Sequence, residues 1–233
     1  MHSILSNLLA ATLFLSTANA ATWYFLRYNL PSTQQFLSFS GTMVIPKLPK
    51  AGTYYLWPGL QTTDGSGVYQ NVLDGRSGTW WIGSGWCCAN PSLPWGSGFN
   101  VNAGDSVAFT NTKGASAWTS TLKKASGGST ASDSFALMGG VLTDRFWCER
   151  TASKTFNQVL FAIELTGVSW DFGPLVFNNV VITSSGTDTK WCTNAPENYN
   201  SASNYVLSNI QASVSGNVVT CKIGTVNLQS PKK

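Results

Sequence analysis

Charged side chains are scarce in this chain. Asp, Glu, Lys and Arg make up 10% of its 233 residues, whereas soluble domains average about 25%. Phe, Trp and Tyr make up 12%, and a chain so poor in charge and rich in aromatics is not intrinsically disordered. The formal net charge is +4, but no run of Lys and Arg concentrates it. We therefore expect no nucleic-acid partner.

Histidine is almost absent, because the only one is His2. Hydrolases with a serine or cysteine nucleophile usually rely on a histidine base to activate it. Imidazole is also a main protein ligand of zinc and copper. Any catalysis by this chain would therefore use carboxylates, amides, tyrosines or backbone groups, and we expect neither a metal nor a cofactor.

Long apolar runs are missing too, apart from one near the N-terminus. Residues 5–15 are rich in Leu, and Ala18-Asn19-Ala20 then supplies the small residues that signal peptidase prefers. An N-terminal membrane anchor is the alternative, but the apolar stretch is shorter than the ~20 residues that a span needs. We expect residues 1–20 to be a signal peptide, residues 21–233 to form one secreted domain, and no membrane association.

Cysteine is sparse but sufficient for two disulfides. Five cysteines follow the apolar stretch, and the oxidising secretory route should pair them. We expect two disulfides and one remaining thiol, although the sequence does not give the connectivity. We expect Cys148, Cys192 and one of the adjacent pair Cys87 and Cys88 to take part in these disulfides.

The hydrophobic pattern is that of short strands separated by turn residues. Turn pairs such as Pro58-Gly59 and Asp74-Gly75 end predicted strands, and a long hairpin loop is expected in the Ser-, Gly- and Thr-rich stretch 114–133. Strands at roughly ten-residue spacing, without long helices, predict an all-β, two-sheet antiparallel β-sandwich over residues 21–233. The predicted strands are 39–45, 53–57, 67–73, 79–82, 99–101, 105–111, 118–123, 135–138, 159–165, 175–183, 205–214 and 217–223.

Two polar side chains interrupt otherwise apolar strand faces. Strand alternation places Glu164 on the same face as Leu160 and Ala162. A carboxylate there is unfavourable unless it is paired or functional. Gln70 interrupts the run Val68–Val72 in the same way. Each also has a structural explanation, since a Glu at a strand end can reach solvent and an amide can hydrogen-bond within a sheet.

Seven short motifs occur in a fixed order through most of the chain. They are Phe39–Pro46, Trp57-Pro58-Gly59-Leu60, Val68–Val72, Thr79-Trp80-Trp81, Asn102–Val107, Ala162-Ile163-Glu164 and Phe172–Asn179. In this order they resemble the motifs of the fungal glutamic peptidases (eqolisins), or of a divergent relative. Three acidic positions of the family pattern differ. Two of them are occupied by Gln61 and Leu165 in this chain, and the third, a Glu within the aromatic strand, has no counterpart near Ile82.

The resemblance implies a concanavalin A-like sandwich (jelly roll) with Gln70 and Glu164 facing each other on its concave side. It implies a secreted acid endopeptidase acting on polypeptides, with Glu164 as general base and Gln70 as the oxyanion stabiliser. Trp57 would form a wall of the site. Further aromatic residues are expected to contact the substrate, namely Trp80, Trp81 and Tyr69. No cofactor is implied, and we expect a monomer.

The supply of aromatic residues leaves other functions open. Aromatic faces stack on sugar rings, so the same fold could serve a glycan-binding or polysaccharide-cleaving protein. The rings could equally be packing residues, because large aromatics dominate sandwich cores. A non-catalytic secreted effector or wall protein is a third reading. The aromatic residues that could stack on a sugar or pack in the core are Trp80, Trp81, Trp86, Trp95, Tyr54, Tyr55 and Tyr69.

Overall fold

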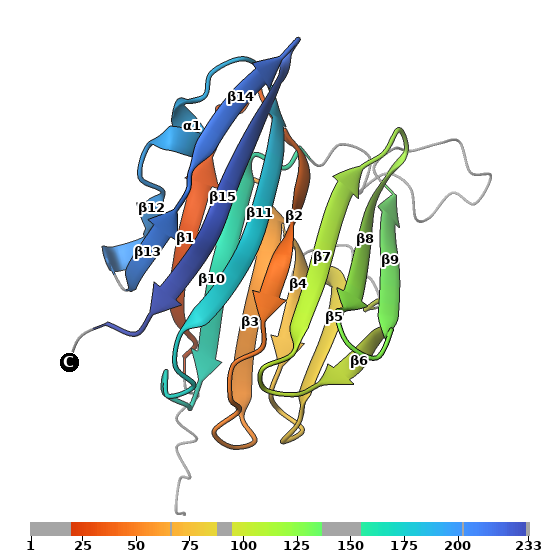
Figure 1. Cartoon of the computed structure of the whole chain (residues 1–233), viewed down its shortest axis with the longest axis vertical. Coiled ribbons are helices and arrows are strands. Elements are labelled where there is room, and N and C mark those ends of the chain that lie inside the picture. Colours follow the sequence, from red (N-terminus) through yellow and green to blue (C-terminus); the bar gives the residue numbers. More distant parts are fainter. Residues whose placement is uncertain (1–19, 66, 88–94, 137–154, 202, 232–233) are drawn as a thin grey trace, which may run out of the picture.

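The structure, a computed structural model, describes residues 20–65, 67–87, 95–136, 155–201 and 203–231. Its regular elements are almost all strands, arranged in two antiparallel sheets (Figure 1). Sheet A has the order β12 (Glu197–Asn198), β1 (Thr22–Asn29), β10 (Gln158–Thr166), β3 (Thr53–Gln61), β4 (Val68–Asp74), β5 (Trp80–Cys87) and β6 (Gly98–Val101).

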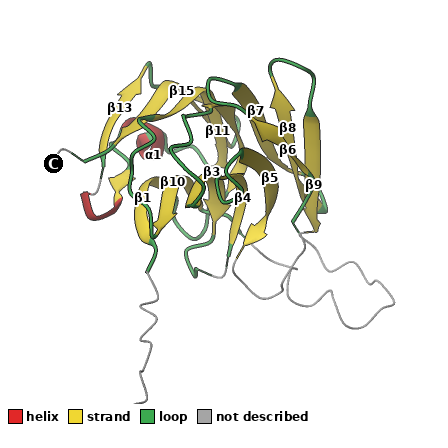
Figure 2. Cartoon of the chain, turned by 90° about the horizontal axis from the view of Figure 1, so that it is seen from below, coloured by secondary structure: helices red, strands yellow, loops and turns green. Residues whose placement is uncertain are grey.

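Sheet B lies face to face with sheet A, and the two layers are seen edge-on in Figure 2. Its order is β13 (Asn204–Ser208), β15 (Val218–Gln229), β11 (Leu175–Ser185), β2 (Phe36–Val44), β7 (Ser106–Lys113), β8 (Ala117–Lys124) and β9 (Thr130–Ala136), with β14 (Gln211–Ser215) also paired to β15. Helical structure is limited to α1 (Lys190–Thr193) and a 3₁₀ turn at Tyr199–Ser201. The predicted two-sheet antiparallel β-sandwich is confirmed.

The core between the sheets is built around aromatic rings. Phe39 packs edge-to-face on Phe109 and on Phe161, with ring centroids 5.1 and 5.2 Å apart. Phe177 lies 4.9 Å from Phe161 and completes the group. Such pairs contribute about 0.5–1.5 kcal/mol each beyond the burial of their area. The cluster therefore holds β10 of sheet A against β2, β7 and β11 of sheet B.

A buried polar network joins the sheets directly behind Gln70. The Asn71 amide donates to Ser84 Oγ at 2.8 Å and to Ser120 Oγ at 2.7 Å, and it accepts a hydrogen bond from Asn111 at 2.7 Å. Buried amides are tolerated only when they are hydrogen-bonded in this way. Because neighbouring strand residues point to opposite faces, the inward anchoring of Asn71 presents Gln70 on the outer face of sheet A.

One predicted strand end is wrong, because β3 continues through Pro58-Gly59. A proline lacks the N–H that a residue of a central strand donates to the neighbouring strand. The register of β3 with β4 accordingly shows no pairs at Trp57 and Pro58, and pairing resumes at Gly59 opposite Gln70. Pairing with β10 on the other side is unbroken. The proline is accommodated where the ladder to β4 opens, and β3 runs the full length of the sheet.

Two further predictions about strands need correction. The stretch 114–133 is no long loop, because β8 and the start of β9 lie within it and are joined by a short turn at residues 125–129. Gly127 and Gly128 adopt positive φ in that turn. Thr119, Ser120 and Thr121 of this stretch lie on β8, and Thr130 and Ser132 lie on β9. The predicted strand 205–214 is divided into β13 and β14 at Asn209, whose φ is 53°.

Disulfide bonds are present, as expected for this chain. Cys192 in α1 is bonded to Cys221 in β15, and Cys87 at the end of β5 is also disulfide-bonded. Cys221 was not among the cysteines named as participants. Cys88 and Cys148 lie outside the described residues, as does nearly all of the expected signal peptide. Within the described ranges, no helix has the length and apolar character needed to cross a membrane.

Removing the disulfide of α1 should lower stability markedly. Cys192 and Cys221 are 29 residues apart in sequence, and closing a loop of that length stabilises by about 3–4 kcal/mol through the unfolded chain. We expect the double variant Cys192→Ala, Cys221→Ala to lose about this much free energy of unfolding in urea denaturation. A denaturation midpoint equal to that of the oxidised wild type would show that the disulfide does not contribute to stability.

Candidate active site

The two polar residues singled out in the sequence project from the outer face of sheet A. Glu164 on β10 lines the same surface as Leu160, and Gln70 on β4 lines it together with Val68. Leu160 also belongs to a small apolar cluster on this face, separate from the intersheet core. The alternation inferred from the sequence is therefore found in the structure. Both polar side chains stand beside apolar residues of this face, among them Trp57, Val72 and Leu160.

Trp57 lies between the two polar residues. On β3, Glu164 is opposite Tyr55 and Gln70 is opposite Gly59, so Trp57 is the middle residue of the intervening segment. Its indole is only 3% exposed. Trp23 from β1 contacts it edge-on, with ring centroids 6.4 Å apart. Trp57 is therefore held in place between the two polar groups, with Glu164 on one side along β3 and Gln70 on the other.

Two cavities open on this face and share the same four residues. The smaller cavity has a volume of about 400 Å³ and the larger about 610 Å³. Glu164, Gln70, Trp57 and Cys87 line both of them. The volumes fall within the roughly 300–1,000 Å³ typical of ligand sites. A substrate chain lying across Trp57 could therefore occupy both cavities and pass both polar groups.

Glu164 is the carboxylate without a partner in this groove. Burial raises the pKa of its half-buried carboxyl above the ordinary value of 4.5. Within the described part of the chain, no hydrogen bond or ion pair reaches either Glu164 or the 5%-exposed Gln70 amide. A carboxylate that lacks a fixed donor is free to accept a proton from a bound water. An amide that lacks a fixed partner can likewise donate to a substrate oxygen.

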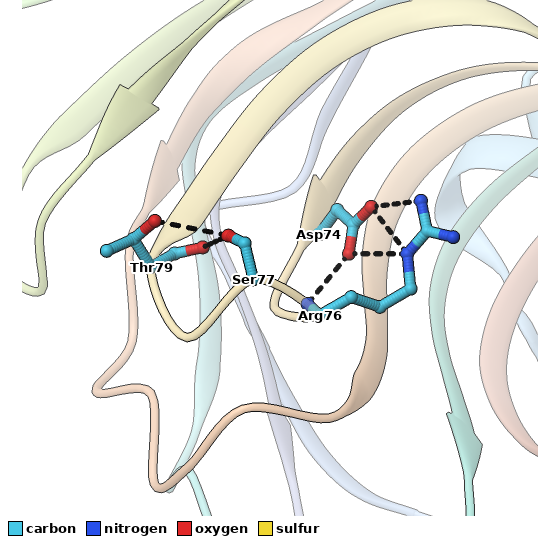
Figure 3. A network of polar contacts seen from close by, with 4 residues as sticks. All are labelled: Asp74, Arg76, Ser77 and Thr79. Atoms are coloured by element: carbon cyan, nitrogen blue, oxygen red, sulfur yellow. Dashed lines mark hydrogen bonds and ion pairs between the residues drawn. The ribbon is translucent and has the colours of Figure 1, made fainter.

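Each of the other charged groups that line the cavities is paired with an opposite charge. Arg76 pairs with Asp74 at 2.7 Å through two guanidinium nitrogens, and its backbone N–H also donates to the same carboxylate (Figure 3). The Arg76 guanidinium also lies 5.3 Å from the ring centroid of Tyr55, which is the strand neighbour of Glu164. Arg27 forms a similar bidentate ion pair with Glu197. Among the described residues lining the groove, Glu164 therefore carries the one uncompensated charge.

Two of the expected substrate-binding residues do not lie on this face. Trp80 is 2% exposed, and its indole N–H donates to the carbonyl of Pro46 at 2.8 Å within the intersheet core. Tyr69 is fully buried in the same core. Tyr69 adjoins Gln70 and Trp80 adjoins Trp81, so strand alternation points each of them away from the groove. Neither can contact a substrate there, whereas Trp57 and Trp81 line the larger cavity.

Several groove residues were not identified from the sequence. Strand β1, which was not predicted, contributes Trp23, Phe25 and Arg27 to the smaller cavity. Phe25 stacks on Tyr199 with ring centroids 4.4 Å apart. A signal was available, because Trp23, Phe25 and Arg27 are alternate residues of one strand and therefore share a face. That pattern begins directly after the predicted signal peptide, where no strand was expected.

The groove offers no obvious metal site. Within the described ranges, no three His, Cys, Asp or Glu side chains lie close enough together to hold a metal ion.

Comparison with known proteins gives a structural match only. No protein-family model matches the chain, and no curated protein matches its sequence. Two solved structures of scytalido-glutamic peptidase are similar to it, one with a peptide-based transition-state analogue and one with a transition-state analogue inhibitor. Their identities are 18% and 17%, their TM-scores 0.50 and 0.51, and each alignment covers 89% of this chain and 98% of the other. The chain has the fold of a glutamic peptidase. The resemblance seen in the sequence motifs is thereby confirmed at the level of the fold.

Two of the departures from the glutamic peptidase pattern, Gln61 and Leu165, lie in different places. Gln61, at the end of β3, lines the smaller cavity, so an amide stands there in place of a carboxylate. Leu165 is 2% exposed and belongs to the intersheet core, on the opposite face from Glu164. Leu165 therefore leaves the groove itself unchanged. The difference at Gln61 alters the charge at one end of the smaller cavity.

Proposed function

We propose that the protein is an acid endopeptidase of glutamic type that cleaves polypeptides. The observation that carries the proposal is that Glu164 and Gln70 open into the same two cavities on either side of Trp57. The fold shared with scytalido-glutamic peptidase, which has been crystallised with a peptide-based transition-state analogue, supports it. Neither residue is engaged by another described side chain, so both remain available to a substrate.

The chemistry assigns a separate role to each polar group. Glu164 removes a proton from a water as that water attacks the scissile carbonyl carbon, and it later returns the proton to the leaving amine. The Gln70 amide donates a hydrogen bond to the oxygen that becomes negative in the tetrahedral intermediate. Both groups are partly or largely withdrawn from solvent, which strengthens such interactions relative to bulk water.

Secretion belongs to the same proposal. It rests on the apolar N-terminal stretch ending at Ala20 and on the disulfides of Cys87 and Cys192, since disulfides persist mainly in oxidising compartments. The mature chain would begin near Ala21. Protein recovered from the culture medium with Met1 intact would contradict this part of the proposal.

A glycan-binding function is the second candidate, and one observation favours it. Trp95 is 45% exposed and lines the larger cavity together with Trp81. Exposed indoles along a groove are what a stacked sugar ring would need. The peptidase function is preferred because the cavity also holds an unpaired carboxylate and an unpaired amide, which sugar stacking alone does not require.

Hydrolysis assays can separate these functions. The purified secreted protein should fragment a denatured protein substrate at weakly acidic pH, and a panel of oligosaccharides should remain intact and unbound. Pepstatin and metal chelators should have no effect, because the proposed mechanism uses neither an aspartate pair nor a metal. Cleavage of glycans without cleavage of the denatured protein would replace the peptidase assignment with the glycan one.

The pH dependence should follow the ionisation of Glu164. The base works only when ionised, and burial raises its pKa above 4.5. We therefore expect kcat/KM to rise with pH and to reach half its maximum on the acid side above pH 4.5, since this parameter reports the free enzyme. The profile can be measured with a fluorogenic peptide at constant ionic strength. A half-maximum well below pH 4 would mean that a different carboxylate is the base.

A further inference from the structure

The walls of the larger cavity include two tryptophans that are seated on glycines. A Cβ added to Gly83 would lie 2.0 Å from Cη2 of Trp81, and one added to Gly98 would lie 2.1 Å from Cζ2 of the same ring. A Cβ added to Gly85 would lie 2.5 Å from Cε3 of Trp95. Each indole thus fills space that a side chain would otherwise occupy. The absence of side chains on β5 and β6 is what allows the two rings to rest against sheet A.

The two indoles differ in how they are attached. Trp81 belongs to β5, where it is paired with Asp74 on β4 and Asn100 on β6. Trp95 comes from the connection between β5 and β6, and it is 45% exposed. Seated over Gly85, directly beside Gln70 in the strand register, Trp95 extends the wall of the groove beyond the sheet. Its free surface is available to a ligand that enters the larger cavity.

The rest of the lining shows which ligand suits this wall. Tyr55, Trp57 and Val72 complete an apolar and aromatic surface. Apart from the two proposed catalytic groups, the charged residues there are Asp74 and Arg76, which are bonded to each other. A sugar ring stacked on this wall would hold several hydroxyls around its edge, and few unengaged polar groups of the cavity could partner them, which is unfavourable once water is displaced. An aromatic side chain needs no such partners and packs well against indole rings.

We propose that the larger cavity is a subsite for an aromatic side chain of the substrate polypeptide, with Trp95 as a specificity-determining residue. The proposal rests on the peptidase function proposed above and assigns the substrate preference of that site. Because Glu164 and Gln70 line the same cavity, the aromatic residue would occupy one fixed position relative to the cleaved bond.

Two substitutions act on this subsite in different ways. Trp95→Ala removes the wall, while Gly85→Ala keeps the indole and displaces it, since the new Cβ would fall 2.5 Å from the ring. Gly85 lies in a strand and does not have a positive φ, so alanine is compatible with the backbone there. Trp170→Ala is the matched control, because Trp170 is a half-buried tryptophan stacked on Phe172 outside both cavities.

The experiment combines a binding and a turnover measurement on the mature protein. Peptides of alanine with terminal lysines, each carrying one phenylalanine at a different position, are bound to the Glu164→Gln variant and cleaved by the wild type. We expect one position at which Phe binds and is cleaved at least tenfold better than Ala. Trp95→Ala and Gly85→Ala should each reduce this ratio about tenfold, with the all-alanine peptide little affected, whereas Trp170→Ala should leave the ratio unchanged.

The outcomes separate this proposal from the peptidase function. Cleavage by the wild type with no positional preference for Phe would overturn the subsite and leave the peptidase function standing. Preferential binding of Phe peptides without cleavage at any pH would support the subsite and reject the peptidase function. Tighter binding of β-1,4-linked glucose oligomers than of any Phe peptide, lost in Trp95→Ala, would overturn the subsite in favour of a glycan.

Discussion

Replacing Glu164 with glutamine should abolish peptide hydrolysis at every pH. The substitution keeps the shape of the side chain but removes the group that accepts a proton from water and returns it to the leaving amine. General acid–base catalysis of this kind contributes about 10²–10⁴ in rate, and a residue that serves both steps belongs at the upper end. We expect kcat for a fluorogenic peptide to fall by about 10⁴-fold, with KM changed little.

The same substitution should leave the fold at least as stable. Because burial raises the pKa of Glu164 in the folded protein, its carboxyl favours folding while it is protonated, and this contribution is lost as pH rises through the folded pKa. Glutamine is neutral at all pH values. Urea denaturation should therefore show little difference between the variant and the wild type at pH 3, and equal or greater stability of the variant at pH 7.

Glu197→Gln is the matched control for this experiment. It makes the same chemical change in a glutamate that is paired with Arg27 at 2.7 Å and that does not line the two cavities of the site. Its activity should stay close to that of the wild type. Hydrolysis by Glu164→Gln at a rate comparable to that of Glu197→Gln would exclude Glu164 as the base.

Strand alternation explains what the sequence could predict. A polar residue on an apolar strand stands out whenever its face is otherwise hydrophobic, and this is how Glu164 and Gln70 were found. Side chains of a strand alternate between its two faces, and the same rule applied to the aromatic residues would have placed Tyr55 and Trp81 on the opposite face from their neighbours Tyr54 and Trp80. The choice of Trp80 and Tyr69 failed because aromatic character alone says nothing about which face a residue occupies.

Other features had no local signal that could reveal them. The glycines of β5 resemble turn residues, and only the packing of Trp81 and Trp95 against them shows why they are there. The predicted strand 53–57 ended before Pro58, because the sequence does not show that the ladder between β3 and β4 opens there; that opening depends on the partner strand. Contacts between distant segments decide both cases, and they are not encoded in a short window of sequence.

The charge of the groove depends on pairing more than on composition. The chain is basic, with a pI near 8.8, yet the arginines that reach the two cavities are each held by a carboxylate. Gln61 contributes no charge, and Leu165 faces the core. Among the described residues lining the groove, a single uncompensated ionisation at Glu164 remains. The acid limb of activity should therefore fit one proton, with a slope of one in a plot of log(kcat/KM) against pH.

Replacing Gln70 with alanine should lower kcat by about 10²–10³-fold, which is the scale for losing one donor to an oxyanion. The amide is 5% exposed and has no described partner to compete for its N–H groups, so the donor is available when negative charge develops. Because that charge exists only in the transition state, the loss should appear in kcat, with little change in KM. Steady-state kinetics with a single fluorogenic peptide can resolve the two parameters.

A cavity left by alanine could itself disturb the site, so Gln70→Met separates the two effects. Methionine fills a similar volume on this largely apolar face but donates no hydrogen bond, and it should reproduce the loss in kcat without loss of stability. Gln158→Ala is the matched control, because Gln158 is a buried glutamine of sheet A that donates to Asn29 at 2.8 Å and lines neither cavity. If Gln70→Met kept more than a tenth of the wild-type kcat, the oxyanion would have to be stabilised by another donor, and Gln70 would be only a packing residue beside Trp57.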